Sequence, residues 1–161
     1  MQHTLSVLVE NKPGVLARIA GLFSGRGFNI TSLTVGETED SSISRMTIIV
    51  TGDDAILEQV SKQLNKLVDV IKVLDLTDEA HLERELVLVK VTAESGRRAE
   101  LTPLVDIFRG KIVDVSEKSL TLQVTGAGSK VNAFIDLVRP FGIKELVRTG
   151  IVALARDPKK K

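Results

Sequence analysis

Residues 3–23 read H-T-L-S-V-L-V-E-N-K-P-G-V-L-A-R-I-A-G-L-F, and within this stretch the spacing of the apolar residues changes once. Before Glu10 they largely alternate with polar residues, which is typical of a strand with one buried face. After Pro13 they recur at intervals of one, three and four residues, which is typical of a helix with one apolar side. Proline suits the first turn of a helix, where its missing N–H costs no hydrogen bond. The stretch therefore predicts a strand, a short turn and a helix.

The chain continues with the same kinds of segment to residue 76. F-N-I-T-S-L-T-V-G and S-R-M-T-I-I-V-T-G predict two strands, and the acidic loop E-T-E-D-S-S joins them as a hairpin. Residues 53–67 begin with acidic N-cap candidates and carry an apolar stripe, so they predict a second helix. V-D-V-I-K-V-L-D-L then predicts a closing strand. The order βαββαβ is that of a ferredoxin-like domain.

The second half of the chain repeats this order after a polar, acidic linker at residues 77–85. The expected elements are a strand at 86–93, a helix at 97–108, strands at 111–116 and 119–126, a helix at 129–141 and a last strand at 143–156. Pro103 is expected either to start its helix late or to kink it. We therefore predict an α+β protein of two tandem ferredoxin-like (βαββαβ) domains, residues 1–77 and 78–161.

Composition excludes several classes of function. The 161 residues include 22 Lys and Arg against 21 Asp and Glu, so the chain lacks the basic field that nucleic-acid binding usually requires. There is no cysteine, which excludes disulfides, thiolate nucleophiles and thiolate metal sites. No signal peptide and no apolar run of about 18 residues is found. We expect a cytoplasmic protein that binds neither nucleic acid nor membrane.

The sequence offers no catalytic constellation. Its two histidines, His3 and His81, form no metal-spaced pair, and each is expected to be a surface or edge residue. G-A-G-S-K at 126–130 lacks the spacing of a phosphate-binding loop and is expected to be an ordinary helix entry. The five phenylalanines fall in or beside helices, which argues against base stacking on the sheets. We predict no catalytic residues and no metal site.

The turn after the first strand has the properties of a small-ligand site. A helix N-terminus exposes backbone amides and a partial positive charge, which suits a carboxylate. Gly14 leaves the approach to these amides open, and Asn11 supplies both a donor and an acceptor, which a zwitterionic amino acid needs. Asn29 begins a strand that starts at the opposite end of the sheet, so the two asparagines need not meet within one chain, but they could meet across a symmetric dimer. The alternative is that N-K-P-G is simply a turn.

The same residues carry a resemblance to a known family. V-E-N-K-P-G-V-L-A-R-I-A-G-L-F-S-G-R-G-F-N-I-T-S-L-T-V-G-E-T-E resembles the start of an ACT domain, the ferredoxin-like module that senses amino acids. More narrowly, it is similar to the small regulatory subunits of acetolactate synthase (acetohydroxyacid synthase). The likeness extends to F-R-G-K-I-V-D-V and P-F-G-I-K-E-L-V-R-T-G-I-V-A-L-A-R in the second half, so it covers essentially the whole chain.

This resemblance implies a homodimeric regulator without a catalytic site of its own. Its implied partner is the catalytic large subunit, which would carry the cofactors thiamine diphosphate, Mg and FAD. The regulator would activate that subunit and confer feedback inhibition by valine or another branched-chain amino acid, in branched-chain amino acid biosynthesis. The residues that match the effector site are Asn11, Gly14, Val15 and Leu16 on the loop side, and Asn29 and Ile30 on the side that the other protomer supplies. The second half has T-A-E-S-G-R-R-A in place of the N-x-x-G loop, so one type of site is expected, in the ACT domain.

Two other functions are compatible with the sequence. A free-standing ACT regulator of gene expression would need a nucleic-acid surface, against which the near-zero net charge argues. A purely structural dimer would bind no amino acid, so calorimetric titration with valine separates it from both sensing hypotheses. Co-purification with a thiamine-diphosphate enzyme separates the two sensing hypotheses from each other.

Overall fold

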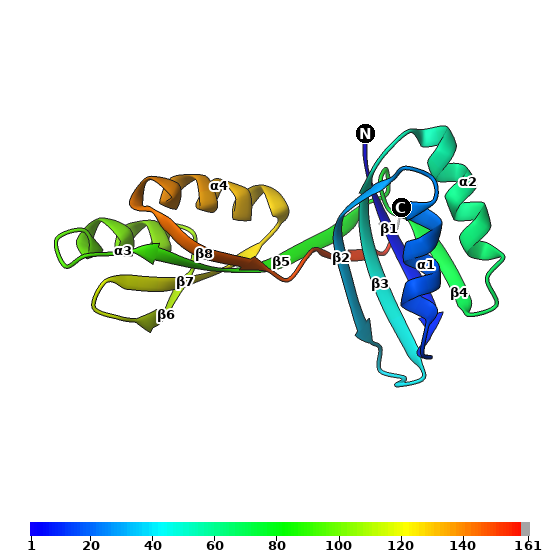
Figure 1. Ribbon diagram of the computed structural model, residues 1–161, viewed down its shortest axis with the longest axis horizontal. Helices are drawn as coiled ribbons and strands as arrows, with labels where there is room; N and C mark the ends of the chain where they lie inside the picture. The colour runs from blue at the N-terminus through cyan, green and yellow to red at the C-terminus, as the bar shows by residue number, and fades with distance from the viewer. Residues whose placement is uncertain (159–161) are drawn as a thin grey trace. The chain divides into compact units, whose positions relative to one another are not determined.

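The computed structural model describes residues 1–158, which divide into two compact units (Figure 1). The first unit holds Met1–Leu82 together with the chain from Ile151 onward, and the second holds Glu83–Gly150. Within the described residues, no helix is both long enough and apolar enough to cross a bilayer.

The first unit is an antiparallel sheet with two helices on one face (Figure 1). Its elements are β1(Gln2–Glu10), α1(Val15–Ser24), β2(Asn29–Glu37), β3(Ile43–Thr51), α2(Asp54–Asn65) and β4(Val70–Asp75). The strands lie in the order β2-β3-β1-β4, so the first and third strands occupy the centre. This is the ferredoxin-like arrangement that the apolar spacing predicts, and the fold prediction is confirmed for this unit.

The core of the first unit lies between the sheet and its helices. The buried side chains come from alternate positions of the strands and from every third or fourth position of the helices: Leu5, Val7, Val9, Ile19, Phe23, Ile48, Val50, Val60 and Leu64. The expected acidic cap of α2 is present, since Asp53 accepts a hydrogen bond from the Ala55 amide at 2.7 Å.

The second unit repeats this plan. Its elements are β5(His81–Thr92), α3(Arg98–Ile107), β6(Lys111–Val115), β7(Ser119–Gly126), α4(Gly128–Val138), the 3₁₀ turn η1(Arg139–Phe141) and β8(Ile143–Arg148). The strand order β6-β7-β5-β8 matches that of the first sheet, and both helices contribute to one apolar core. The second ferredoxin-like fold is therefore confirmed as well. The helix α3 begins at Arg98 and continues past Pro103, which excludes a late start; the alternative, a kink at Pro103, stays a prediction.

The end of the chain differs from the prediction. The single strand expected at residues 143–156 is two strands, β8 and β9(Val152–Ala155). Gly150 separates them with a φ of 86°, a left-handed conformation that strands do not contain and that glycine adopts without penalty. The strand β9 pairs with β5, and the Arg156 amide donates to the Ala80 carbonyl at 2.9 Å.

After Gly150 the chain lies on the face of the first sheet that is opposite α1 and α2. The Ile151 amide donates to the Ser32 hydroxyl at 2.8 Å, and the Ala153 amide donates to the Thr47 hydroxyl at 3.3 Å. Ala153 and Thr47 are both buried. The compact units therefore divide after Leu82 and again after Gly150, whereas the sequence placed a single division between residues 77 and 78 and all later residues in the second domain.

Candidate functional site

The loop between β1 and α1 turns the chain through a left-handed residue. Gly14 has φ 84° and ψ −8° and occupies the N-cap position of α1. An L side chain at this φ would be strained, so the glycine is required by backbone conformation. A Cβ at this position would lie only 3.3 Å from Nη1 of Arg18, so the guanidinium of that residue lies over the glycine.

The first turn of α1 presents free backbone donors. The helix bonds begin with the Arg18 amide, which donates to the Gly14 carbonyl at 3.1 Å, and the Val15 amide makes a long 3.4 Å bond to the Lys12 carbonyl. For the amides of Leu16 and Ala17, residues 1–158 provide no acceptor. No side chain in this part of the chain caps the helix, so these groups and the helix dipole remain available to an anion.

The two apolar residues predicted for the loop side differ in exposure. Val15 is buried against the sheet, whereas 45 % of Leu16 is exposed. Leu16 can therefore contact a ligand directly, and Val15 instead fixes the helix terminus on the core. The predicted role of Val15 as a ligand contact remains a prediction.

Asn11 is tied to the β2–β3 hairpin of its own chain. Its side-chain amide donates to Oε1 of Glu37 at 3.1 Å and to the Ser41 carbonyl at 3.0 Å, and its backbone amide donates to the Ser42 carbonyl at 2.8 Å. Both amide hydrogens of the side chain are thereby used. The acceptor Oδ1 is the part of the side chain that remains for a ligand.

Charged side chains surround the loop. Nζ of Lys12 lies 2.7 Å from Oε2 of Glu10, and this carboxylate raises the pKa of the lysine. Arg18 forms an ion pair with Asp69, whose backbone carbonyl also accepts from the Glu10 amide at 2.8 Å. Three residues around this loop were not predicted from the sequence: Arg18, Glu37 and Asp69. Only Arg18 left a local signal, since it stands one helical turn after Gly14.

Asn29 and Ile30 lie at the other end of the sheet. Asn29 pairs with Thr51, which is also opposite Gln2 at the start of β1, whereas Asn11 follows the end of β1. The strands β1 and β2 are both antiparallel to β3, so they run parallel to each other. A nine-residue strand spans about 27 Å at roughly 3.4 Å per residue, so one protomer does not bring Asn11 and Asn29 together.

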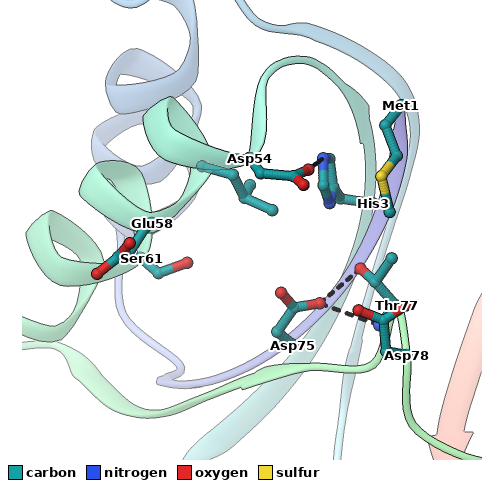
Figure 2. A pocket seen from close by; sticks show the side chains of 9 residues that line it. Met1, His3, Asp54, Glu58, Ser61, Asp75, Thr77 and Asp78 are labelled. Carbon is teal, nitrogen blue, oxygen red and sulfur yellow. Dashed lines mark hydrogen bonds and ion pairs between the residues drawn. The ribbon is translucent and has the colours of Figure 1, made fainter.

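A pocket of about 350 Å³ opens at the same end of the sheet as Asn29 (Figure 2). Seven of its nine lining residues are polar, and four of these are carboxylates: Met1, His3, Asp54, Leu57, Glu58, Ser61, Asp75, Thr77 and Asp78. His3 is buried, with Nε2 3.1 Å from Oδ1 of Asp54 and 3.3 Å from the Gly52 carbonyl. The expectation of a surface or edge histidine is therefore wrong, because β1 is a central strand.

None of the predicted site residues lines this pocket. Two pairs of its side chains are bonded to each other, as Figure 2 shows: His3 with Asp54, and Thr77 with Asp75, which accepts from both the amide and the hydroxyl of Thr77. Residues 1–158 contain no group of three or more His, Asp or Glu side chains that could hold a metal ion. The start of α1 is therefore the stronger candidate site.

Comparison with known proteins shows the family of the chain. Residues 5–72 match the family described as the AHAS small subunit-like ACT domain, and residues 84–157 match the family described as the small subunit of acetolactate synthase. The probable acetolactate synthase small subunit of Archaeoglobus fulgidus is 61 % identical over 160 residues, which cover 99 % of this chain and 100 % of that protein. The chain belongs to the acetolactate synthase small-subunit family.

Other members of the acetolactate synthase small-subunit family are nearly as similar. The acetolactate synthase small subunit of Mycobacterium bovis is 53 % identical over 157 residues, covering 98 % of this chain and 94 % of that protein. The crystal structure of the acetolactate synthase small subunit from Thermotoga maritima superposes with a TM-score of 0.88 at 48 % identity. That alignment covers 98 % of this chain and 99 % of the other.

Proposed function

We propose that this chain is the regulatory subunit that activates the catalytic subunit of acetolactate synthase and makes it sensitive to valine or another branched-chain amino acid. The observation that carries the proposal is the start of α1, where Gly14 is left-handed and the amides of Leu16 and Ala17 find no acceptor among residues 1–158. The reaction and the cofactors thiamine diphosphate, Mg and FAD belong, in this proposal, to the catalytic subunit. Both subunits would act in the cytoplasm.

The ligand's two charged groups find complementary partners at this loop. The carboxylate of the amino acid would accept hydrogen bonds from the amides at the helix terminus, with the guanidinium of Arg18 above Gly14 adding positive charge. The ammonium group would donate to Oδ1 of Asn11, whose amide hydrogens are held by Glu37 and Ser41. The hairpin bonds thus orient the asparagine before the ligand arrives, which lowers the entropy lost on binding.

The aliphatic tail would lie against Leu16 and against Ile30 of the second protomer. Burial of one methylene-sized group is worth about 0.8 kcal/mol, so valine, leucine and isoleucine should differ only modestly in affinity. In this proposal the charged groups of the ligand give the site its affinity for amino acids, and the side chain sets the smaller differences in affinity among valine, leucine and isoleucine.

The complete site requires two protomers in this proposal. Asn29 and Ile30 lie about 27 Å of strand away from the loop of their own chain, so they can serve only the loop of a neighbour. A symmetric homodimer gives two equivalent sites, each with a loop from one protomer and the start of β2 from the other. An amino acid bound in this site would contact both protomers, so its binding would be coupled to the association of the two chains.

Inhibition follows if valine binds one state of the complex better than another. A ligand shifts an equilibrium only by the difference between its affinities for the two states, typically about 1–3 kcal/mol in allosteric proteins. A site shared by two protomers provides such a difference in affinity. Any change in the relative position of the protomers changes the distance between the loop of one and the strand of the other, and so changes the affinity for the ligand.

Mixed dimers test the shared site. N11A and N29A chains should each lose most valine binding, by about 10–100-fold for a hydrogen bond to a charged group worth about 1.5–3 kcal/mol. A dimer of one N11A and one N29A chain has one doubly defective site and one intact site. Calorimetry should therefore recover half of the wild-type sites at wild-type affinity. N65A, at an exposed asparagine whose side-chain amide bonds the Ser61 carbonyl of its own helix, is the matched control.

Reconstitution tests the partner. Addition of this chain to the purified catalytic subunit should raise acetolactate formation, and valine should then reverse the increase. The N11A chain should still activate but lose the response to valine. Failure to bind or activate the catalytic subunit would contradict the proposed partner and favour the free-standing regulator. Activation by N11A with unchanged valine inhibition would exclude the assigned effector site.

A further inference from the structure

The strand β6 forms one edge of the second sheet and has β7 as its single neighbour among the described strands. All five of its residues are exposed. An edge strand leaves N–H and C=O groups unpaired along its outer side, and these groups form a template for another strand. We call Lys111–Val115 the β6 edge.

The β6 edge is unusually apolar for an exposed edge. Val113 and Val115 are 48 % and 61 % exposed, and Ile107, at the end of the neighbouring α3, is 72 % exposed. Burial of these side chains against another molecule would be favourable, since apolar surface removed from water contributes about 25 cal/mol per Å². The edge therefore has both the backbone groups and the apolar surface of an interface.

Two opposite charges lie on one face of this edge. Lys111 pairs with Gln123 and Asp114 pairs with Thr121, and the register shifts between Ile112 and Asp114. This bulge brings Lys111 and Asp114 to the same face even though an odd number of residues separates them. Neither has an ion pair or a side-chain hydrogen bond within residues 1–158, although Asp114 contributes to the raised pKa of Lys90.

We propose that the β6 edge pairs antiparallel with the β6 edge of a second copy of this chain, with Lys111 opposite Asp114. An antiparallel pair of identical strands has a two-fold axis, so each lysine meets the aspartate of the other chain and two ion pairs form. A shift of one residue would place lysine opposite Val115 and aspartate opposite Ile112. The charges therefore select both the partner and the register.

The opposite edge of the same sheet, formed by β8, also exposes the apolar side chains of Leu146 and Val147, but it differs in its charges. In β8, Glu145 bonds Nζ of Lys90 at 2.8 Å and Arg148 bonds the buried Glu85, so Lys144 is the one charged side chain of this strand without an ion pair within residues 1–158. The β6 edge carries charges of both signs that are not engaged within residues 1–158, and it is the edge that a second copy fits.

Cysteine pairing tests the register directly, because the chain contains no cysteine. Full-length K111C and D114C chains are mixed, oxidised mildly and separated on a denaturing, non-reducing gel. Directly opposed residues lie within the roughly 4.4–6.8 Å Cα separation that a disulfide spans, so the mixture should give a covalent dimer. Each variant alone should give little, because its own cysteines would be about 10 Å apart along the pair. A mixture of D114C with K118C, at an exposed residue of the β6–β7 turn, is the control.

A charge swap gives the second readout. In sedimentation velocity, K111D should weaken self-association through this edge at least tenfold, and K111D/D114K should restore it. Absence of the covalent dimer, or equal yields in the control mixture, would overturn the proposal. The proposal would also be overturned if K111D lost binding to the catalytic subunit and K111D/D114K did not restore it. That result would show that the β6 edge binds the catalytic subunit and not a second copy of this chain. The disulfide forms or fails independently of valine binding, so it does not depend on the proposed effector site.

Discussion

Asn11 and Glu37 are joined by a 3.1 Å hydrogen bond between the ends of two strands that are not neighbours in the sheet. The bond runs from the side-chain amide of Asn11 to a carboxylate oxygen of Glu37, and it anchors the β2–β3 hairpin beside the start of α1. Asn11 therefore has a structural role within its own protomer in addition to its proposed role toward the ligand. The two roles can be separated because they use different atoms of one side chain.

N11D tests the structural role. The change replaces the donor with a carboxylate 3.1 Å from that of Glu37, so the two like charges should destabilise the first unit by about 1 kcal/mol at pH 7. The double variant N11D/E37Q restores a donor opposite an acceptor and should recover most of the loss. Urea unfolding measures both. Equal stability of N11D and the wild type would show that the hairpin does not depend on this bond.

G14A tests the backbone requirement at the helix N-terminus. Alanine in the left-handed region is disfavoured by about 1–2 kcal/mol, so this variant should unfold at lower urea concentration. G21A is the matched control, since Gly21 lies on the exposed side of α1 and a Cβ added there would meet no atom within 4 Å. That variant should gain about 0.5–1 kcal/mol. The same substitution is thus expected to change stability in opposite directions at two glycines that lie about two helical turns apart.

The hairpin loop should depend on pH through Asp40. The amide and hydroxyl of Ser42 donate to its carboxylate and lower its pKa below the ordinary 3.8. A lowered pKa means that this stabilisation is present above pH 3.8 and is lost as the pH falls through the folded-state value. S42A should raise the pKa of Asp40 toward 3.8 in an NMR titration of the carboxyl carbon. S41A, which removes a neighbouring hydroxyl, should leave that pKa where it is in the wild type.

R148A should strongly destabilise the second unit. Glu85 is buried, and Nε of Arg148 donates to its Oε1 at 3.1 Å while the guanidinium also reaches Oδ1 of Asn132 at 2.7 Å. Removal of the arginine leaves a buried carboxylate without its countercharge, which costs about 3–5 kcal/mol. K144A, at an exposed lysine of the same strand, should change stability by less than about 0.5 kcal/mol. Similar unfolding midpoints for the two variants would contradict the buried ion pair.

T47V should loosen the segment after Gly150 from the first sheet. Valine has nearly the shape of threonine but offers no acceptor, so the Ala153 amide would lose its 3.3 Å hydrogen bond at a cost of about 1 kcal/mol. Hydrogen exchange at Ala153 should become faster by about fivefold, the rate equivalent of that free energy. T51V, at the exposed end of the same strand, should leave this exchange rate unchanged.

The helices, the strands and the layers that they form in each unit could be predicted from the sequence, because the spacing of apolar residues within each element is a local pattern. The alternation in β1 and the three-to-four spacing in α1 each reflect a single buried face, and Leu5, Val7, Ile19 and Phe23 are buried as that pattern predicts. The βαββαβ order then leaves few ways to cover one sheet face with both helices. The position of Asn29 at the far end of the sheet followed from the same order, and the register agrees with it.

Contacts between distant segments could not be predicted in this way. The partners of Asn11 are 26 and 30 residues away in the chain, and no spacing pattern marks them. The hydroxyl of Thr47 that receives the Ala153 amide is 106 residues away. Gly150 was the one local indication that the last strand is interrupted, and the apolar residues on both sides of it, Leu146, Val147, Ile151 and Val152, made a single continuous strand the simpler prediction.

The return of the chain after Gly150 makes the second unit an insertion within the first. Met1 and Pro158 both belong to the first unit, so a stop codon after residue 80 would remove a piece of that unit along with the second. Excision of residues 83–150, with a short linker between Leu82 and Ile151, is the cut that respects the fold. A chain shortened progressively from its C-terminal end therefore loses the segment that bonds Ser32 and Thr47 on the first sheet before it loses any residue of the second unit.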